Sequence, residues 1–388
     1  MKPFNPEKVK FFKTPKYGGV TLALLSMFVL ASMMVVWNRL PPESSSMPLR
    51  VLCDDALRFP VERGASRFER EMKVKVTLDF VQSQSQQDGY DLYIPTERTV
   101  AKEDGYGSTT IPVAFQSLIL ATRKNFSSDL SDLNRFFQED LAYATCQTSS
   151  SSGSALQEAL TRAGKWDKVI SQGKATFSSS VEAAVSLSSE NSLDAVFIWD
   201  SVARQFDLRI HRLKELKNAS GAIRAILGKD TENRAQALQF ARFLAAPSKG
   251  QFYFAKHKFV GVKGDAWTKK PVLYVYCASN AKDLMLDKFE RFEEHEQVSI
   301  DPHFLDQEKI PLAIGLIARS NAKKSLPDLV FGSMGKEGEE LSGQFELFSD
   351  PLDLNVLQIP VYKRKLTRFP STVRRLLQFL QASEGANN

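Results

Sequence analysis

The sequence has few of the residues on which metal sites and most catalytic motifs depend. Only three of its 388 residues are cysteines and four are histidines. The histidines are scattered, and none forms a His-Glu-x-x-His or a Cys/His pattern with metal-ligand spacing. There is also no Walker loop, no Gly-x-Ser-x-Gly and no Gly-x-Gly-x-x-Gly after a strand. The sequence therefore predicts no catalytic residue, no metal site and no cofactor, and an enzyme is the least supported hypothesis.

The cysteine count argues against a disulfide scaffold, because three cysteines leave at least one thiol unpaired. Cys53 ends the apolar run Leu49–Cys53, and Cys277 lies in a similar run. Small apolar positions of this kind are typical of buried strands. We expect both thiols to be buried and reduced.

The basic charge is concentrated in a short N-terminal tail. The formal net charge is +6, but residues 1–17 alone carry five lysines and one glutamate. The remainder of the chain is therefore close to neutral, at +2. A near-neutral surface gives no electrostatic argument for a nucleic-acid partner, and none is predicted.

The segment after the tail is typical of a membrane helix. Tyr17–Trp37 has no charged residue and is 21 residues long, which as a helix spans about 30 Å, the thickness of a hydrocarbon core. Aromatic rings stand at both of its ends. The lysines before it place residues 1–16 in the cytoplasm and the later residues outside. Residues 38–48 form a polar linker. A cleaved signal peptide is the alternative, although no clear Ala-x-Ala site follows.

The chain contains an internal repeat. Leu49–Cys53 aligns with Leu273–Cys277, and the offset of 224 residues holds for nearly thirty residues without a gap. Each copy has the pattern of a buried strand, a helix and a second strand. Asp91–Ile94 then matches Asp328–Phe331 at a larger offset, and Pro311–Ser320 is predicted to supply a helix that the first copy lacks.

Both copies are predicted to end in an amphipathic helix, at Ala235–Ala246 and Val373–Ala382. Before its closing helix, the first copy carries about 90 extra residues, which form a second lobe. Alternating strands and helices predict an α/β fold with largely parallel sheets. The predicted boundaries are a two-lobed domain at 49–262 (lobe 1, 49–122 and 214–262; lobe 2, 123–213) and a second single-lobe repeat at 270–385.

Several segments in this order resemble the molybdate-binding branch of the type II periplasmic solute-binding proteins. They are the opening strand and helix from Val51, the strand and serine loop at Val76–Ser83, the strand, small-residue loop and helix at Leu141–Asp167, Ser179–Ala184, Asp194–Ala203 and the closing segment Ala235–Phe259. The resemblance covers residues 49 to 260. It implies a two-lobed periplasmic-binding-protein type II fold, here with an extra repeated α/β lobe and one preceding transmembrane helix.

The resemblance also implies a ligand site. In that family an oxyanion is held between the lobes by hydroxyls and by N–H groups at helix starts, which are suited to anions. The corresponding positions are Ala56, Ser83, Ser152, Val181 and Trp199. Alanine at position 56 has no hydroxyl, tryptophan replaces a tyrosine at 199, and two aspartates, Asp54 and Asp55, precede Ala56. The serine run 148–154 is either an anion-binding loop or a plain loop with an N-cap serine.

Two functional hypotheses follow. The first is a membrane-anchored, extracytoplasmic solute-binding protein for a small oxyanion resembling molybdate, tungstate or sulfate, which it delivers to an ABC transporter permease in the same membrane. The lobes would close about hinges near Ala121–Lys124 and Leu213–Ala222. The second is a degenerate relative that binds no ligand and acts as an envelope scaffold or interaction module, in which the second repeat is a partner surface or a lid.

Overall fold

The computed structural model describes residues 47–81, 89–98, 109–189, 192–229, 231–320, 325–334, 343–348, 352–353 and 358–385. Residues from Pro48 onward form one compact unit. The predicted tail, membrane segment and most of the linker lie outside the described residues. Among the described helices, none has the length and apolarity needed to cross a membrane.

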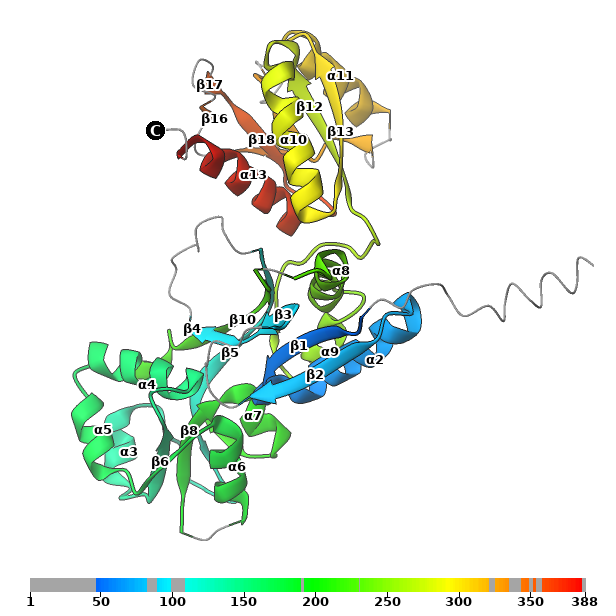
Figure 1. The fold of residues 1–388 in the computed structure, drawn as a ribbon. Helices are drawn as coiled ribbons and strands as arrows, with labels where there is room; N and C mark the ends of the chain where they lie inside the picture. The colour runs from blue at the N-terminus through cyan, green and yellow to red at the C-terminus, as the bar shows by residue number, and fades with distance from the viewer. Residues whose placement is uncertain are drawn as a thin grey trace, which may run out of the picture. The chain divides into compact units, whose positions relative to one another are not determined.

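Lobe 1 is built around the start of the chain and the return from lobe 2 (Figure 1). Its elements are β1 (Leu49–Asp54), η1 (Asp55–Leu57), α2 (Arg58–Met72), β2 (Val76–Val81), β3 (Leu92–Ile94), β4 (Thr96–Arg98), the first part of β5 (Thr110–Thr122), β10 (Ser220–Leu227), α8 (Arg234–Ala245), α9 (Gln251–Lys256) and β11 (Val260–Gly261). Helix α2 forms because its apolar residues recur at helical spacing, and Val61, Ala65 and Phe68 are buried against the sheet.

Lobe 2 is the inserted segment. It contains α3 (Leu133–Gln138), β6 (Tyr143–Cys146), α4 (Ser151–Arg162), α5 (Trp166–Gln172), β7 (Ala175–Phe177), α6 (Ser180–Ser189), β8 (Ala195–Trp199), α7 (Asp200–Gln205), β9 (Arg209–His211) and η2 (Lys214–Leu216). It has a hydrophobic core of its own, separate from that of lobe 1.

Strand β5 joins the two lobes without a break. It pairs with β10 up to Ser117 and with β8 from Leu118, so it changes partners between these two residues. This exchange lies earlier than the predicted crossing at Ala121–Lys124. The β5 pairings are antiparallel, so the expectation of largely parallel sheets was wrong for the centre of the sheet. Parallel pairing occurs farther out on both sides of the sheet. Strand β1 pairs in parallel with β2 and β3, and β6 pairs in parallel with β7 and β8.

The C-terminal domain has a five-stranded sheet in the order β13-β12-β14-β18-β15. Its elements are β12 (Val272–Ala278), η3 (Ser279–Ala281), α10 (Lys282–Glu296), β13 (Ser299–Leu305), α11 (Lys309–Arg319), β14 (Leu329–Phe331), β15 (Phe345–Leu347), β16 (Leu352–Asp353), β17 (Gln358–Ile359), β18 (Val361–Arg364) and α13 (Pro370–Gly385). Helices α10 and α13 contribute to one apolar cluster and α11 to another. The helix predicted at Pro311–Ser320 is α11.

The two sheets share a register. Leu49 pairs with Val76 in β1 and β2, and Leu273 pairs with Ile300 in β12 and β13, which is the predicted offset. In both sheets the first strand lies between two parallel neighbours.

Two aspartates, one in each sheet, make matching hydrogen bonds. Asp91 accepts hydrogen bonds from the Arg50 backbone N–H (2.8 Å) and the Thr231 hydroxyl (2.6 Å). Asp328 accepts them from the Tyr274 N–H (3.1 Å) and the Thr367 hydroxyl (2.5 Å). In each sheet an aspartate side chain thus connects the first strand to the segment before the last helix of that unit.

Candidate functional site

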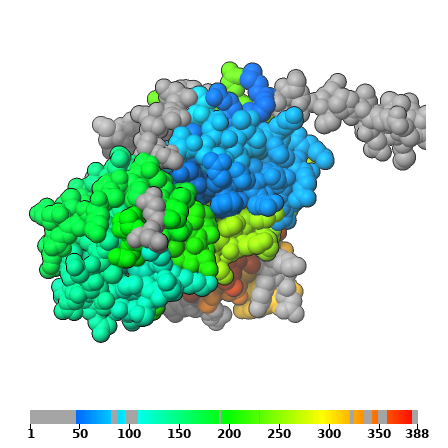
Figure 2. Space-filling model, turned by 90° about the horizontal axis from the view of Figure 1, so that it is seen from below, coloured from blue at the N-terminus to red at the C-terminus, as the bar shows by residue number. Residues whose placement is uncertain are grey.

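The lobe 1 side of the candidate site begins where β1 ends. The Asp54 carboxylate accepts a hydrogen bond from the Ala56 N–H (3.0 Å) and so caps η1. Ala56 is only 3% exposed, and its methyl group belongs to the apolar core of lobe 2. The short helix η1 therefore presses against the opposite lobe, and in Figure 2 the surfaces of the two lobes, blue and green, meet directly.

Two adjacent carboxyl groups lie at this junction. Burial, together with the charge of Asp54, raises the pKa of Asp55 to about 7. Burial also raises the pKa of Asp54, against the hydrogen bonds from Ala56 and Thr96 that favour its ionised form. The charge of Asp55 therefore changes near neutral pH.

The lobe 2 side is the start of α4. Ser150 is the N-cap residue, because its hydroxyl oxygen accepts a hydrogen bond from the Gly153 N–H (3.1 Å) and donates to the Gln147 carbonyl (2.7 Å). Ser152 is 1% exposed, and its hydroxyl lies 3.4 Å from that of Ser150. The serine run thus contains the N-cap predicted as one alternative. It also brings buried hydroxyls to the positive end of a helix dipole.

Gly153 has no room for a side chain. A Cβ atom there would lie 2.0 Å from the Gln147 carbonyl oxygen and 2.4 Å from that of Cys146. The backbone of α4 therefore starts directly against the end of β6, and only glycine permits this approach. Cys146, at that strand end, has its thiol pKa raised to about 11 by burial, although the Ser152 and Ser180 hydroxyls partly oppose the shift.

Trp199 connects the starts of α4 and α6. It is the last residue of β8 and is 1% exposed. Its indole N–H donates to the Ser151 hydroxyl (3.1 Å), and its backbone N–H donates to the Ser180 hydroxyl (3.4 Å). A Cβ added to Gly221 would lie 2.9 Å from the indole ring, so the ring reaches the crossing strand β10. The indole donor is used within lobe 2.

Val181 follows Ser180 in the first turn of α6 and packs, partly buried, on the lobe 2 core. The structure therefore connects Trp199 to Ser151 and Ser180, and it places Ala56 in the core that contains Trp199. Ser83 lies outside the described residues. Sequence reasoning did not select Ser151, Ser180 or Thr96, although Ser180 stands in the quoted segment Ser179–Ala184. Ser151 stands in the serine run 148–154 that was predicted as either an anion-binding loop or a plain loop. The contacts of Thr96 with this junction left no signal in the sequence.

The arrangement offers neutral hydrogen-bond donors and the neighbouring carboxyl groups of Asp54 and Asp55, which we call the acid pair. It offers no set of metal ligands. Within the described ranges no group of three His, Cys, Asp or Glu side chains is placed to hold a metal ion. Hydroxyls and helix N-termini suit an anion, whereas a carboxylate near the same point repels one unless it is protonated.

Comparison with known protein families shows which family the chain belongs to. The family of bacterial extracellular solute-binding proteins matches residues 49–259, which is more than half of the chain. The chain belongs to this family. The match covers both lobes and ends before the C-terminal domain. A search of curated proteins finds no significant match.

Solved structures of binding proteins are similar to this chain at low identity. The periplasmic molybdate-binding protein of Azotobacter vinelandii is 15% identical, with 55% of this chain and 100% of that chain covered and a TM-score of 0.44. Peb3 from Campylobacter jejuni is 12% identical (55% and 100% covered, TM-score 0.43), and an ABC-type phosphate transport receptor from Vibrio cholerae is 11% identical (55% and 100%, 0.39). These similarities are too distant to assign a ligand.

Proposed function

We propose that this solute-binding protein is held in the cell membrane by residues 17–37, exposes its domains outside the cytoplasm, and binds a small oxyanion between its lobes for delivery to an ABC transporter permease. The observation that carries the ligand class is the start of α4. There a serine-capped N-terminus presents the buried hydroxyls of Ser151 and Ser152 beside Trp199, at the junction with lobe 1. Val181 and Ser83 complete the proposed site.

The acid pair sets the conditions for such a ligand. When Asp55 is ionised, its charge opposes an approaching anion. When it is protonated, the repulsion is removed and the carboxyl group gains an O–H donor. Because its pKa is about 7, oxyanion binding is expected to strengthen below neutral pH. The expected ligand is thus one that is bound together with a proton.

A second candidate function is an interaction module without a ligand. Three observations favour it: position 56 has no hydroxyl, the Trp199 indole N–H already donates to Ser151, and Ala56 and Ser152 are buried with both lobes in contact. A site whose donors are satisfied internally gains less from a ligand.

Thermal unfolding separates the two functions. Residues 44–388 are heated with millimolar molybdate, tungstate, sulfate or phosphate at pH 6 and pH 8, with chloride of matched ionic strength as the control. A ligand that binds only the native state raises the melting temperature by mass action. A rise with one oxyanion that is larger at pH 6 supports the site. If none of the four anions raises the melting temperature, the oxyanion-binding function is rejected and the interaction module is the remaining function.

The anchor needs a separate test, since residues 17–37 lie outside the described residues. In intact cells stripped of any outer barrier, externally added protease should digest residues 48–388 while the N-terminal tail stays protected. Replacing Leu24 and Leu25 by arginine should release the protein from the membrane, because charge at the centre of a spanning helix is costly. Protection of the large domain would contradict the orientation.

We infer that the C-terminal domain is a second copy of the lobe 1 unit. The shared strand register and the paired roles of Asp91 and Asp328 support this inference. The last turns of helices α2 and α10 make matching hydrogen bonds to the strand that follows. The Glu69 carboxylate accepts from the Val76 N–H (2.9 Å), and the Glu293 carboxylate accepts from the Ile300 N–H (2.5 Å). Exchanging Asp328 for alanine should therefore destabilise the C-terminal domain about as much as the same exchange of Asp91 destabilises lobe 1.

A further inference from the structure

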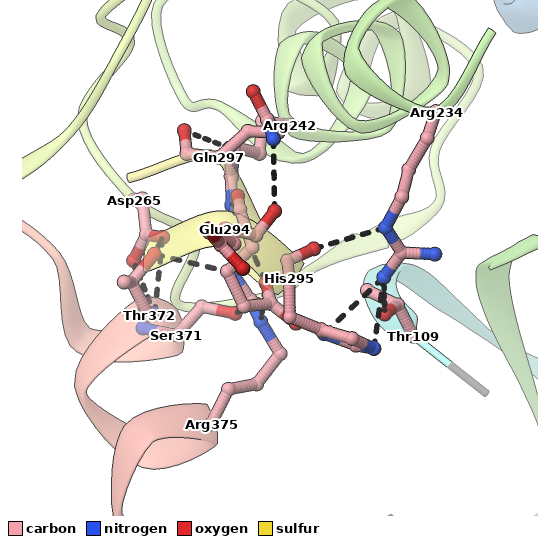
Figure 3. A network of polar contacts seen from close by, with 11 residues as sticks. Thr109, Arg234, Arg242, Asp265, Glu294, His295, Gln297, Ser371, Thr372 and Arg375 are labelled. Atoms are coloured by element: carbon pink, nitrogen blue, oxygen red, sulfur yellow. Dashed lines mark hydrogen bonds and ion pairs between the residues drawn. The ribbon is translucent and has the colours of Figure 1, made fainter. Parts of the chain in front are cut away.

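Five buried polar residues connect lobe 1 to the C-terminal domain (Figure 3). We call them the docking network, and each is at most 7% exposed: Arg242, Asp265, Glu296, Thr372 and Arg375. Arg242 belongs to the closing helix α8 of lobe 1, Asp265 to the linker, and the other three to α10 and α13. The network thus spans the segment that joins the two domains.

Glu296 lies at the centre of this network. Its Oε2 atom is 2.9 Å from Arg375 Nε and 3.3 Å from Arg242 Nη2. Arg242 also donates to the backbone carbonyls of Glu296 and Gln297. Burial opposes ionisation of Glu296, but Arg375, His295 and Arg242 outweigh it and hold its pKa at about 2. Both arginines therefore act on a glutamate that is ionised at neutral pH.

The linker completes the network. The Asp265 carboxylate accepts hydrogen bonds from the backbone N–H groups of Ser371 (2.7 Å) and Thr372 (3.1 Å), and from the Thr372 hydroxyl (2.6 Å). It therefore caps the start of α13. Arg375 donates in turn to Thr372 Oγ1 (3.1 Å). With two arginines and two carboxylates, the docking network is neutral overall, which makes burial of its four charges tolerable.

The edge of the interface reaches the strand that joins the lobes. Arg234 Nε donates to the His295 carbonyl (3.0 Å), and Arg234 Nη2 donates to the Thr109 hydroxyl (2.9 Å) directly before β5. In the linker, the Trp267 ring packs edge-on against Phe243 of α8 (5.2 Å between centroids). Every lobe residue in these contacts belongs to lobe 1.

Comparison of the two copies shows that these charges are not part of the repeated unit. At the offset that aligns β1 with β12, Glu296 corresponds to Met72. When Phe243 is aligned with Phe379, Arg375 corresponds to Gln239 and Arg242 to Gln378. Glu296, Arg375 and Arg242 thus each occur only in the copy where they face the other domain. Buried charges are costly unless they are paired, so their placement indicates an interface built for docking.

We propose that the C-terminal domain is docked permanently on α8 through this network and moves with lobe 1 as one body. Lobe 2 is then the part that moves when a ligand binds, and the C-terminal domain is a fixed extension of lobe 1 instead of a lid. The partner of the α8 surface is residues 270–385 of the same chain. This proposal does not depend on which ligand is bound, or on whether any is bound.

The test is to cut the linker and ask whether the domains stay together. A protease site is placed at the exposed residues Lys269–Lys270 of the full-length chain, and the cleaved protein is examined by size-exclusion chromatography. The two fragments should elute together at micromolar concentration. Glu296→Gln keeps the size of the side chain but leaves two buried arginines without a counter-charge. It should weaken association of the fragments by about 100-fold or more.

Two controls complete the experiment. Glu290→Gln makes the same change at an exposed position of α10 and should leave the fragments associated. If Glu296→Gln prevents folding, Asp265→Asn tests the network from the linker side, with circular dichroism to verify that the domains are folded. Separation of the unsubstituted fragments would overturn the proposal. Co-elution of folded Glu296→Gln fragments with unchanged affinity would overturn the role of the network.

Discussion

At the scale of single residues, Asp55 has a carboxyl group whose charge changes near neutral pH. Its pKa of about 7 lies well above the ordinary 3.8, because burial and Asp54 both disfavour the ionised form. This shift costs native-state stability: the cost grows as the pH rises from about 3.8 to about 7 and is complete above about pH 7. Its charge also opposes an anion over the same range.

Asp55→Asn should remove this pH dependence. In the unsubstituted protein, affinity for sulfate is expected to rise as the pH falls from 8 to 6, by up to about tenfold per pH unit for one linked proton. In the variant the affinity should be constant, and native stability at pH 8 should increase. Titration calorimetry at both pH values measures the first effect. Asp79→Asn, an exposed change in the same lobe, is the control and should keep the pH dependence.

Glu296 is the second residue with a large expected effect. Removing one partner from a buried, hydrogen-bonded ion pair typically costs about 3–5 kcal/mol. Glu296→Gln should lower the free energy of unfolding by this amount, whereas Glu290→Gln should change it by less than about 0.5 kcal/mol. Denaturant unfolding at pH 7 measures both.

The effect of acid on the docking network follows from the direction in which the pKa of Glu296 is shifted. The pKa of Glu296 is lowered from 4.5 to about 2, so the stabilisation is complete above pH 4.5 and is lost as the pH falls towards 2. The stability difference between the protein and Glu296→Gln should therefore shrink over this interval. A difference that persists at pH 2 would show that the carboxylate charge is not its cause.

At the scale of elements, the sequence patterns predicted more of the fold than of the site. Apolar periodicity predicted helices α8, α11 and α13 and the strands β1 and β12. The buried thiols of Cys53 and Cys277 are confirmed. Such patterns succeed because one face of each element is buried locally.

Other features left no local signal. Strand β5 continues without a break through the exchange at Ser117–Leu118, and the polar pair Gln116 and Ser117 before it does not by itself indicate a change of partner strand. The pairing of Arg242 with Glu296 joins residues 54 apart, and the link from Trp199 to Ser151 joins residues 48 apart. These contacts exist only after the chain has folded.

The start of α4 offers an element-scale prediction. Gly153→Ala would force a methyl group onto two backbone carbonyls, so the loop before α4 must move. We expect a loss of about 2 kcal/mol or more in stability and loss of oxyanion binding. Gly315→Ala is the matched control, because a Cβ there meets nothing within 4 Å and glycine is the poorer helix former. It should be neutral or stabilising. Equal destabilisation by both variants would contradict the close approach.

At the scale of the whole molecule, two lobes of an extracellular solute-binding protein carry a third α/β unit on one of them. Family membership covers residues 49–259. The third unit contacts lobe 1 through the buried ion pairs of Glu296 with Arg242 and Arg375. Closure on a ligand would then move lobe 2 against a body composed of lobe 1 and the C-terminal domain.

The most direct test of the proposed function is titration calorimetry of residues 44–388 with molybdate, tungstate, sulfate and phosphate at pH 6. We predict saturable binding of at least one oxyanion with one ligand per chain, and weaker binding by Ser152→Val, which removes a buried hydroxyl from the start of α4. Absence of binding up to millimolar concentration for all four anions, with a folded protein, would contradict the oxyanion site.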